Sequence, residues 1–261
     1  MKLLEARNLS FAWAARGSMT REPILDDISF RIGEGKKLAI LGANGAGKTT
    51  LLSLLGGRLA PKTGEVLLDG GSVRGFSPRA LARKVAFLPQ IERLSFNYKV
   101  LEFVLMGRAP HIEALAQPDA GDEAAALGAL AELGLESLAG RRAGELSGGE
   151  YQLVRIARCL AQEAEILLLD EPTSLLDPAN AQRVARELAS LASKGKTIIF
   201  TTHDMALARS LADTILMIGQ RRLLRMGPPS EVLTPEFLEE AFGVEFGIGQ
   251  VPTAYPSAAS R

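Results

Sequence analysis

The stretch Lys37-Leu-Ala-Ile-Leu-Gly-Ala-Asn-Gly-Ala-Gly-Lys-Thr-Thr50 decides the fold of this chain. Its apolar start, Lys37–Leu41, predicts a buried strand, and Thr50–Leu55 predicts the start of a helix. Between them, Gly42–Thr49 matches the pattern G-x-x-x-x-G-K-[ST] at every fixed position. In this strand–loop–helix setting, glycines let the backbone wrap a phosphate chain, and the helix N-terminus adds positive potential. The stretch therefore predicts a phosphate-binding loop.

Two side chains of this loop carry the expected chemistry. The ammonium of Lys48 would reach the β- and γ-phosphates of ATP, and the hydroxyl of Thr49 would ligate Mg²⁺. The other candidate ATP-binding residues of this stretch are Gly42, Asn44, Gly45, Gly47 and Thr50. The alternative is a glycine turn that only joins a strand to a helix, and the length of the match argues against it.

Composition limits the class of protein. The 261 residues are 47% hydrophobic, which suits one large domain or a core with a subdomain. Lys and Arg (30) balance Asp and Glu (30), so a dominant electrostatic partner such as nucleic acid or an anionic lipid surface is not expected. The single cysteine, Cys159, excludes a disulfide framework within the chain and fits a reducing compartment. We expect it to be a small buried apolar residue.

The sequence carries no uninterrupted apolar run of about 18 residues, the length that predicts a transmembrane helix. Its start, Met1-Lys-Leu-Leu-Glu-Ala-Arg7, lacks the apolar core of a signal peptide. We therefore expect a soluble, cytoplasmic protein whose contact with a membrane comes through a partner.

Hydrophobic patterning predicts an α/β fold with two additions. Alternating segments at Leu9–Trp13 and Ile28–Ile32 indicate an N-terminal antiparallel sheet. Buried parallel strands are expected at Leu38–Leu41, Val85–Leu88, Ile166–Leu169, Thr197–Thr201 and Thr214–Ile218. The block from about 98 to 142 has helical spacing, and residues 230–243 predict one or two short helices ending at Gly243.

One domain over residues 1–245 is expected, followed by a tail. Its parts are an antiparallel β region over 1–35, an α/β core over 36–90 and 145–220, an inserted helical subdomain over 91–144, and a C-terminal strand with helices over 221–245. The tail is 246–261, and the part of it from Val251 onward, which contains Pro, Ser and Ala, is expected to be mobile.

Polar residues follow three of the predicted strands, where a parallel sheet places its ligand crevice. Asp170 and Glu171 end the run that starts at Ile166: Asp170 could hold Mg²⁺, and Glu171 could orient the attacking water. His203 could donate a hydrogen bond to the γ-phosphate, and Gln90 could touch Mg²⁺ or the water. The plainer alternatives are solvated acids that end a strand, a structural histidine and an amide at a loop entry.

A second glycine-rich string, Leu146-Ser-Gly-Gly-Glu150, completes the pattern. Alone it predicts no more than a turn before a helix. Together with the residues above it resembles the ATP-binding-cassette (ABC) ATPase family over roughly residues 3–245. The motifs, in the family's order, are the P-loop Gly42–Thr49, the Q-loop Gln90, the signature Leu146–Glu150, the Walker B run Ile166–Glu171, the D-loop Ser174–Asp177 and the switch His203.

That resemblance implies a head-to-tail dimer of two copies with ATP sandwiched between them. Ser147, Gly148 and Gly149 of one copy would face the γ-phosphate held by Lys48 of the other, and Asp177 would lie along the seam between the copies. The signature departs from the family's commoner pattern because Glu150 stands in place of glutamine and Tyr151 in place of a basic residue. The Ser-Gly-Gly core is intact, so we expect the ATPase activity to be altered rather than lost.

The family also stacks an aromatic ring of the N-terminal sheet on adenine. Phe11 and Trp13 lie two apart and would share a strand face, so either could stack, and Trp13 aligns better with the family's usual tyrosine. Plain packing within the sheet is the alternative.

The string Val104-Leu-Met-Gly-Arg-Ala-Pro-His111 resembles ATPase subunits of bacterial importers for iron–siderophore, haem or cobalamin, as does the stretch Arg225–Val244. A local turn is the alternative, and His111 lacks a second metal ligand nearby in sequence. The resemblance implies integral membrane permease subunits as partners, an extracytoplasmic solute-binding protein acting indirectly, and a peripheral position at the cytoplasmic face of the inner membrane. The transported molecule would not touch this chain, so these residues do not indicate its identity.

Two other functions remain open at this point. A soluble ABC ATPase that transports no solute, as in iron–sulfur cluster assembly, would share every catalytic motif. A nucleotide-dependent protein acting on nucleic acid is disfavoured by the zero net charge and by the absence of a basic, aromatic-interleaved patch. Whether the chain is a monomer without ATP is also undetermined.

Overall fold

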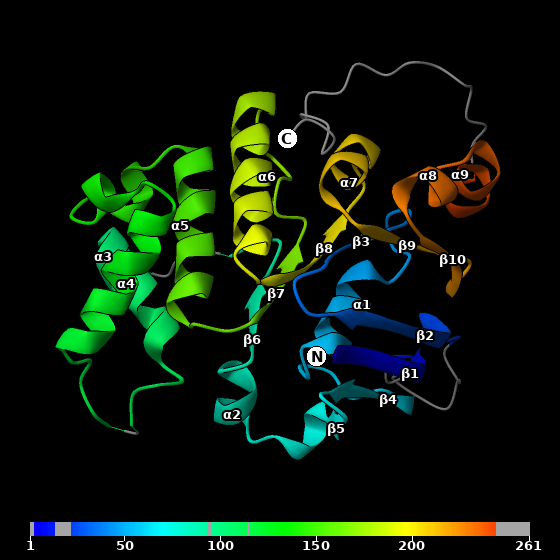
Figure 1. Ribbon diagram of the computed structural model, residues 1–261, viewed down its shortest axis with the longest axis horizontal. Coiled ribbons are helices and arrows are strands. Elements are labelled where there is room, and N and C mark those ends of the chain that lie inside the picture. The colour runs from blue at the N-terminus through cyan, green and yellow to red at the C-terminus, as the bar shows by residue number, and fades with distance from the viewer. Residues whose placement is uncertain (1–2, 14–21, 93–95, 114, 244–261) are drawn as a thin grey trace.

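Two β-sheets enclose the helix that follows the glycine loop. The computed structural model describes residues 3–13, 22–92, 96–113 and 115–243. The helix, α1 (Lys48–Leu55), buries its leucines between a four-stranded and a six-stranded sheet (Figure 1). The core of this half of the molecule therefore lies around the helix whose N-terminus carries the predicted phosphate loop.

The six-stranded sheet has the order β10-β9-β3-β8-β7-β6. Its strands are β3 (Lys37–Leu41), β6 (Val85–Leu88), β7 (Ile166–Asp170), β8 (Thr197–Thr202), β9 (Thr214–Gly219) and β10 (Arg222–Gly227). All pairs are parallel except β9 with β10. Leu38 and Ile40 face one apolar cluster while Ala39 and Leu41 face another, so β3 is buried on both sides. The five predicted parallel strands are confirmed.

The four-stranded sheet is antiparallel and has the order β2-β1-β4-β5. Its strands are β1 (Leu3–Phe11), β2 (Leu25–Gly33), β4 (Thr63–Leu68) and β5 (Gly71–Ser72). The predicted antiparallel pairing is confirmed, but the prediction that the first strand continues to Trp13 is wrong. Pairing with β2 ends where Phe11 lies opposite Leu25, and Trp13 follows the strand.

Helices cover the face of the larger sheet that lies opposite α1. These are α5 (Gly148–Ala161), α6 (Pro178–Ser193) and α7 (Met205–Leu211). The short helices α8 (Pro229–Val232) and α9 (Pro235–Phe242) contact β9 and β10. The second of them ends at Gly243, whose φ of 71° is the left-handed conformation that glycine adopts readily, and this confirms the predicted C-terminal helices. The prediction of a mobile tail from Val251 lies outside the described residues.

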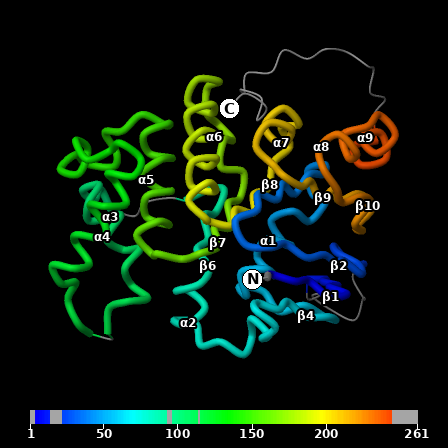
Figure 2. Tube along the Cα trace, in the orientation of Figure 1, coloured from blue at the N-terminus to red at the C-terminus, as the bar shows by residue number. Residues whose placement is uncertain are grey.

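A helical block stands to one side of the sheets (Figure 2). It contains α3 (Val100–Leu105) and α4 (Ala120–Glu132), which pack on α5, and it is joined to β6 by the segment that carries Gln90. The remaining helix, α2 (Pro78–Ala82), lies below β6, and short 3₁₀ turns occur at Val73–Gly75, Met106–Arg108, Glu136–Leu138 and Ala143–Glu145. Helix α5 contacts both the block and β6, so it links the block to the sheet.

The string Val104–His111 fastens this block together. A Cβ on Gly107 would lie 2.2 Å from the carbonyl oxygen of Arg158, so only glycine permits this approach to α5. The buried guanidinium of Arg108 donates to Asp122 (3.0 Å), to Glu163 (2.7 Å) and to a backbone carbonyl.

Among the described residues, no helix is long and apolar enough to cross a membrane.

Candidate functional site

The glycine loop closes around the ammonium of Lys48. Nζ donates to the carbonyl oxygens of Gly42 (2.9 Å) and Ala43 (3.1 Å), and the residue is 6% exposed. A Cβ on Gly42 would lie 2.5 Å from the carbonyl oxygen of Ile218, and Gly47 has φ of 97°, so both positions require glycine. Burial lowers the pKa of Lys48, against the opposing effect of nearby Glu171 and Asp170. An anion seated in the loop would supply a further counter-charge.

Asp170 and Thr49 meet beside the loop. The Thr49 hydroxyl donates to Oδ1 of Asp170 at 3.1 Å, and the same oxygen accepts the hydroxyl of Thr201 at 2.6 Å. Asp170 ends β7 and is 3% exposed. A hydroxyl and a carboxylate are oxygen donors of the kind that Mg²⁺ prefers, so the residues fit this ion.

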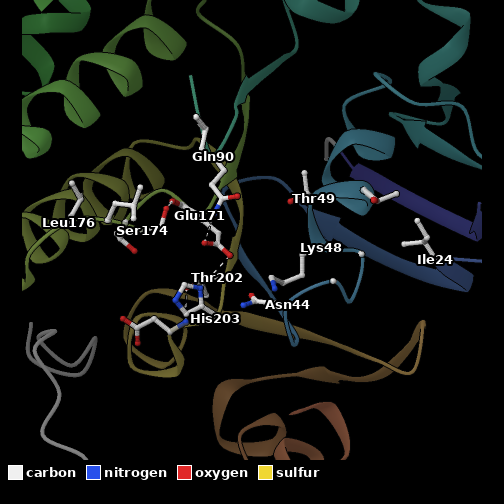
Figure 3. Close-up of a pocket in the computed structure, with 17 residues that line it drawn as sticks. Ile24, Asn44, Lys48, Thr49, Gln90, Glu171, Ser174, Leu176, Thr202 and His203 are labelled. Carbon is white, nitrogen blue, oxygen red and sulfur yellow. Dashed lines mark hydrogen bonds and ion pairs between the residues drawn. The ribbon is translucent and has the colours of Figure 1, made fainter. Parts of the chain in front are cut away.

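Glu171 lies between Gln90 and His203 (Figure 3). The amide of Gln90 donates to Oε2 at 2.9 Å, and Nδ1 of His203 lies 3.3 Å from Oε1. The backbone N–H of Glu171 donates to the Thr201 hydroxyl, and the backbone is in the left-handed region at φ 47°. A carboxylate held by two polar side chains in an unusual backbone conformation is typical of a functional position.

These side chains surround a cavity of about 910 Å³. Its lining contains most of the predicted nucleotide residues, namely Asn44, Gly45, Gly47, Lys48, Thr49, Thr50, Gln90, Glu171 and His203. Segments distant in sequence are thus brought together by α1, β7 and β8. The lining does not contain Trp13, Ser147, Gly148, Gly149 or Asp177.

The signature residues form a separate unit at the start of α5. Ser147 caps the helix: its hydroxyl accepts the N–H of Glu150 (3.3 Å) and donates to the Glu150 carboxylate (2.7 Å). A Cβ on Gly149 would lie 2.1 Å from Oδ1 of Asn180, whose amide donates to Asp177 (2.6 Å). The signature and the residue that caps α6 are therefore packed together, outside the chain's own cavity.

The two candidate aromatic residues differ in exposure. Phe11 is 7% exposed, whereas Trp13 is 47% exposed and packs edge-to-face against Phe11 with ring centroids 5.0 Å apart. Of these two residues, Trp13 is therefore the one with ring surface available to a ligand. Two other sequence predictions concern Cys159, which is buried as expected, and His111, whose Nε2 lies 3.0 Å from the carbonyl oxygen of Gln162. The described residues contain no cluster of metal-binding side chains.

Sequence reasoning missed several residues of the site. The Thr201 hydroxyl hydrogen-bonds both the Asp170 carboxylate and the Glu171 N–H. Its place at the end of an apolar strand is the feature of the sequence that could have indicated this role. Thr202 and Asp204 follow on the same segment and line the cavity, as does Ile24. Asp204 also caps α7 through two backbone N–H groups.

Comparison with known proteins identifies the family. The family model described as "ABC transporter" matches residues 25–174. The chain belongs to the ABC transporter family. As an ABC ATPase it binds and hydrolyses ATP.

Similar proteins extend over nearly the whole chain. The hemin import ATP-binding protein HmuV of Thermobifida fusca (strain YX) is 39% identical over 250 residues, covering 96% of this chain and 85% of the relative. A metal-chelate type ABC transporter in an inward-facing conformation is 36% identical with a TM-score of 0.82, covering 94% of this chain and 90% of that one. A bacterial ABC transporter cassette solved as a dimer is 28% identical with a TM-score of 0.74, covering 87% and 98%.

Proposed function

We propose that this ABC ATPase powers import of a metal chelate of the iron–siderophore, haem or cobalamin type by ATP-driven closure of a dimer. The observation that carries the ATPase chemistry is the position of Glu171 between Gln90 and His203, in the lining of a cavity that is also lined by Lys48. The names of the hemin-importing relative and of the metal-chelate neighbour support the import role.

In the proposed mechanism the phosphates of ATP lie over the loop. Lys48 binds the β- and γ-phosphates, and Thr49, Asp170 and Gln90 are the residues that would hold Mg²⁺ directly or through water. When bound, Mg²⁺ would neutralise developing charge on the phosphates. Glu171 orients the attacking water, and His203 donates a hydrogen bond to the γ-phosphate.

A second copy of the chain would complete each site. Ser147, Gly148 and Gly149 do not line the chain's own cavity, yet a hydroxyl and N–H groups at a helix start suit a phosphate. In a head-to-tail dimer they would face the γ-phosphate held by the other copy, with Asp177 at the seam. Trp13 would stack on adenine. Residues 1–245 would act as one ATPase domain, followed by the tail 246–261.

The membrane subunits would dock beside the helical block. A groove of about 490 Å³ lies between the end of α1, α2, β6 and Gln162, and its lining includes Arg58, Phe76 and Leu81. A short helix of the permease would fit here, which would place the chain at the cytoplasmic face of the membrane. The solute-binding protein would act only through that permease, and nucleic acid is not an expected partner.

The test isolates the tagged chain from its native membranes in mild detergent. We expect it to bring down integral membrane subunits, and we expect hemin, a ferric siderophore or cobalamin to stimulate ATP hydrolysis by the complex in liposomes. Leu81→Glu should abolish the association with membrane subunits without changing basal ATPase activity. The matched change Leu127→Glu on α4 should leave the association intact. An active ATPase that brings down no membrane subunit would instead indicate the soluble, non-transporting type.

A further inference from the structure

Two buried polar side chains of α5, Gln152 and Arg155, are not explained by nucleotide binding. Both are largely buried, at 7% and 5% exposed, in a helix whose other buried positions are mostly apolar. Burying an amide and a guanidinium is costly unless each finds partners, so their contacts indicate what they are for.

Their partners flank the residues of the candidate site. Arg155 donates through Nη2 to the carbonyl oxygen of Pro89, the residue before Gln90. Gln152 donates through Nε2 to the carbonyl oxygen of Pro172, the residue after Glu171, at 2.7 Å. The two side chains are joined by a 2.7 Å hydrogen bond from Nη1 of Arg155 to Oε1 of Gln152.

The result is a bridge from one catalytic segment to the other through α5. The bridge ties the backbone beside Gln90 to the backbone beside Glu171, and these two side chains hydrogen-bond each other at 2.9 Å. Glu92 adds a second link, because its carboxylate accepts from Arg155 (3.4 Å) and from Arg158 (2.6 and 2.9 Å). Arg158 in turn lies over the ring of Phe103 in α3, 4.5 Å from its centroid.

We propose that Gln152 and Arg155 are positioning residues that set the Gln90–Glu171 contact according to the orientation of the helical block. Helix α5 packs on α3 and α4, so a rotation of the block moves the bridge. Because Arg155 holds the carbonyl beside Gln90 and Gln152 holds the carbonyl beside Glu171, a rotation of α5 displaces the two segments by different amounts and changes the Gln90–Glu171 contact. This inference rests on the proposed roles of Gln90 and Glu171 in hydrolysis.

The amide at 152 is the part that a near-isosteric change can test. Gln152→Glu keeps an oxygen for Arg155 but replaces the donor to Pro172 with an oxygen, which faces that carbonyl unfavourably. The phosphate loop is untouched, so we expect kcat to fall about tenfold or more with KM for ATP changed less than about threefold. Arg155→Lys should behave alike, because an ammonium cannot reproduce the planar set of donors.

A structural role alone is distinguished by a double-mutant cycle. In a Gln90→Ala background, Gln152→Glu should lower kcat by less than about twofold, because the contact it acts through is already absent. Hydrogen–deuterium exchange should also become faster in residues 87–92 of the single variant. The matched control is Lys196→Met, which removes another side-chain donor to a backbone carbonyl, that of Ala164, at the opposite end of β7 and β8 from Glu171. It should leave kcat unchanged.

Two results would overturn the proposal. One is a normal kcat in both Gln152→Glu and Arg155→Lys, and the other is a full, multiplicative loss in the Gln90→Ala background. If Gln152→Glu does not fold, as judged by circular dichroism, Arg155→Lys carries the same cycle. Failure of the proposed function would look different. The wild-type chain would then not hydrolyse ATP, or its Glu171→Gln variant would hydrolyse ATP at the wild-type rate.

Discussion

The hydroxyl of Thr201 donates to Oδ1 of Asp170 at 2.6 Å while it accepts the backbone N–H of Glu171 at 2.8 Å. One buried hydroxyl therefore positions both acids that end β7. Asp170 is held beside the Thr49 hydroxyl, and Glu171 is turned toward Gln90 and His203. Thr201 is 0% exposed, so water cannot replace it without a rearrangement of the strand.

Thr201→Val tests this relationship, because valine keeps the shape and removes the hydroxyl. We expect a loss of about 1–3 kcal/mol in the free energy of unfolding, since the Glu171 N–H loses its partner. We also expect kcat to fall by about tenfold or more. The matched control is Thr197→Val at the other end of β8, where the hydroxyl accepts the Gly35 N–H. It should cost stability without changing kcat; equal kinetic losses in both would contradict the assignment.

Trp13 is the single tryptophan of the chain, so its fluorescence reports on one position. If it stacks on adenine, adding ATP should change the emission, and Lys48→Ala should shift that change to higher ATP concentration. Trp13→Ala should weaken ATP binding by roughly 5- to 150-fold, as expected for the loss of about 1–3 kcal/mol of base stacking. Unchanged affinity in Trp13→Ala together with a loss in Phe11→Leu would assign the stacking to Phe11.

Glu150 predicts a pH dependence of stability. Its hydrogen bond from the Ser147 hydroxyl, followed by that from the Ser147 backbone N–H, holds the pKa of this carboxyl below its ordinary value. Because the folded-state pKa is lowered, the contribution is complete above the ordinary value and is lost as pH falls through the lowered one. Urea unfolding should show wild type more stable than Glu150→Ala at pH 7 by about 0.5–1 kcal/mol, and the difference should shrink in acid. A difference that is independent of pH would refute this assignment.

Burial raises the pKa of the Cys159 thiol to about 11. At pH 8 the reactive thiolate would then be about one part in a thousand, and the surrounding helices exclude reagents. We expect a thiol-specific chromophoric disulfide to react very slowly with the folded protein and completely in guanidinium chloride. Rapid reaction of the folded chain would show that α5 opens locally.

The five parallel strands of the larger sheet could be predicted from sequence because they are almost entirely buried. Runs such as Ile166–Leu169 contain no alternating polar residues. A run of this kind is typical of a parallel strand that is covered on both faces. Strand β4 was missed because Thr63, Gly64 and Glu65 are exposed and read as a loop. It is a strand because β1 pairs with it, a long-range contact that local pattern does not reveal.

The site was predictable where a motif is contiguous and not where it depends on packing. Gly42–Thr49 could be interpreted alone, since one loop supplies its own geometry. Thr201, Gln152 and Arg155 could not, because their importance comes from contacts with residues 20 to 66 positions away. The separation of Ser147 from the cavity is likewise a property of the fold, and it is the reason we propose that a second copy completes the site.

ATP-driven closure of a dimer is tested by the mass of the Glu171→Gln variant in solution with saturating Mg²⁺-ATP, measured by light scattering. This variant keeps the proposed nucleotide residues and removes the carboxylate that we propose orients the attacking water, so ATP should bind and persist. We expect a shift to twice the mass of the chain, which is lost when Lys48→Ala or Ser147→Arg is added to the same variant. A variant that binds ATP yet stays monomeric, or that hydrolyses ATP at the wild-type rate, would contradict the proposed mechanism.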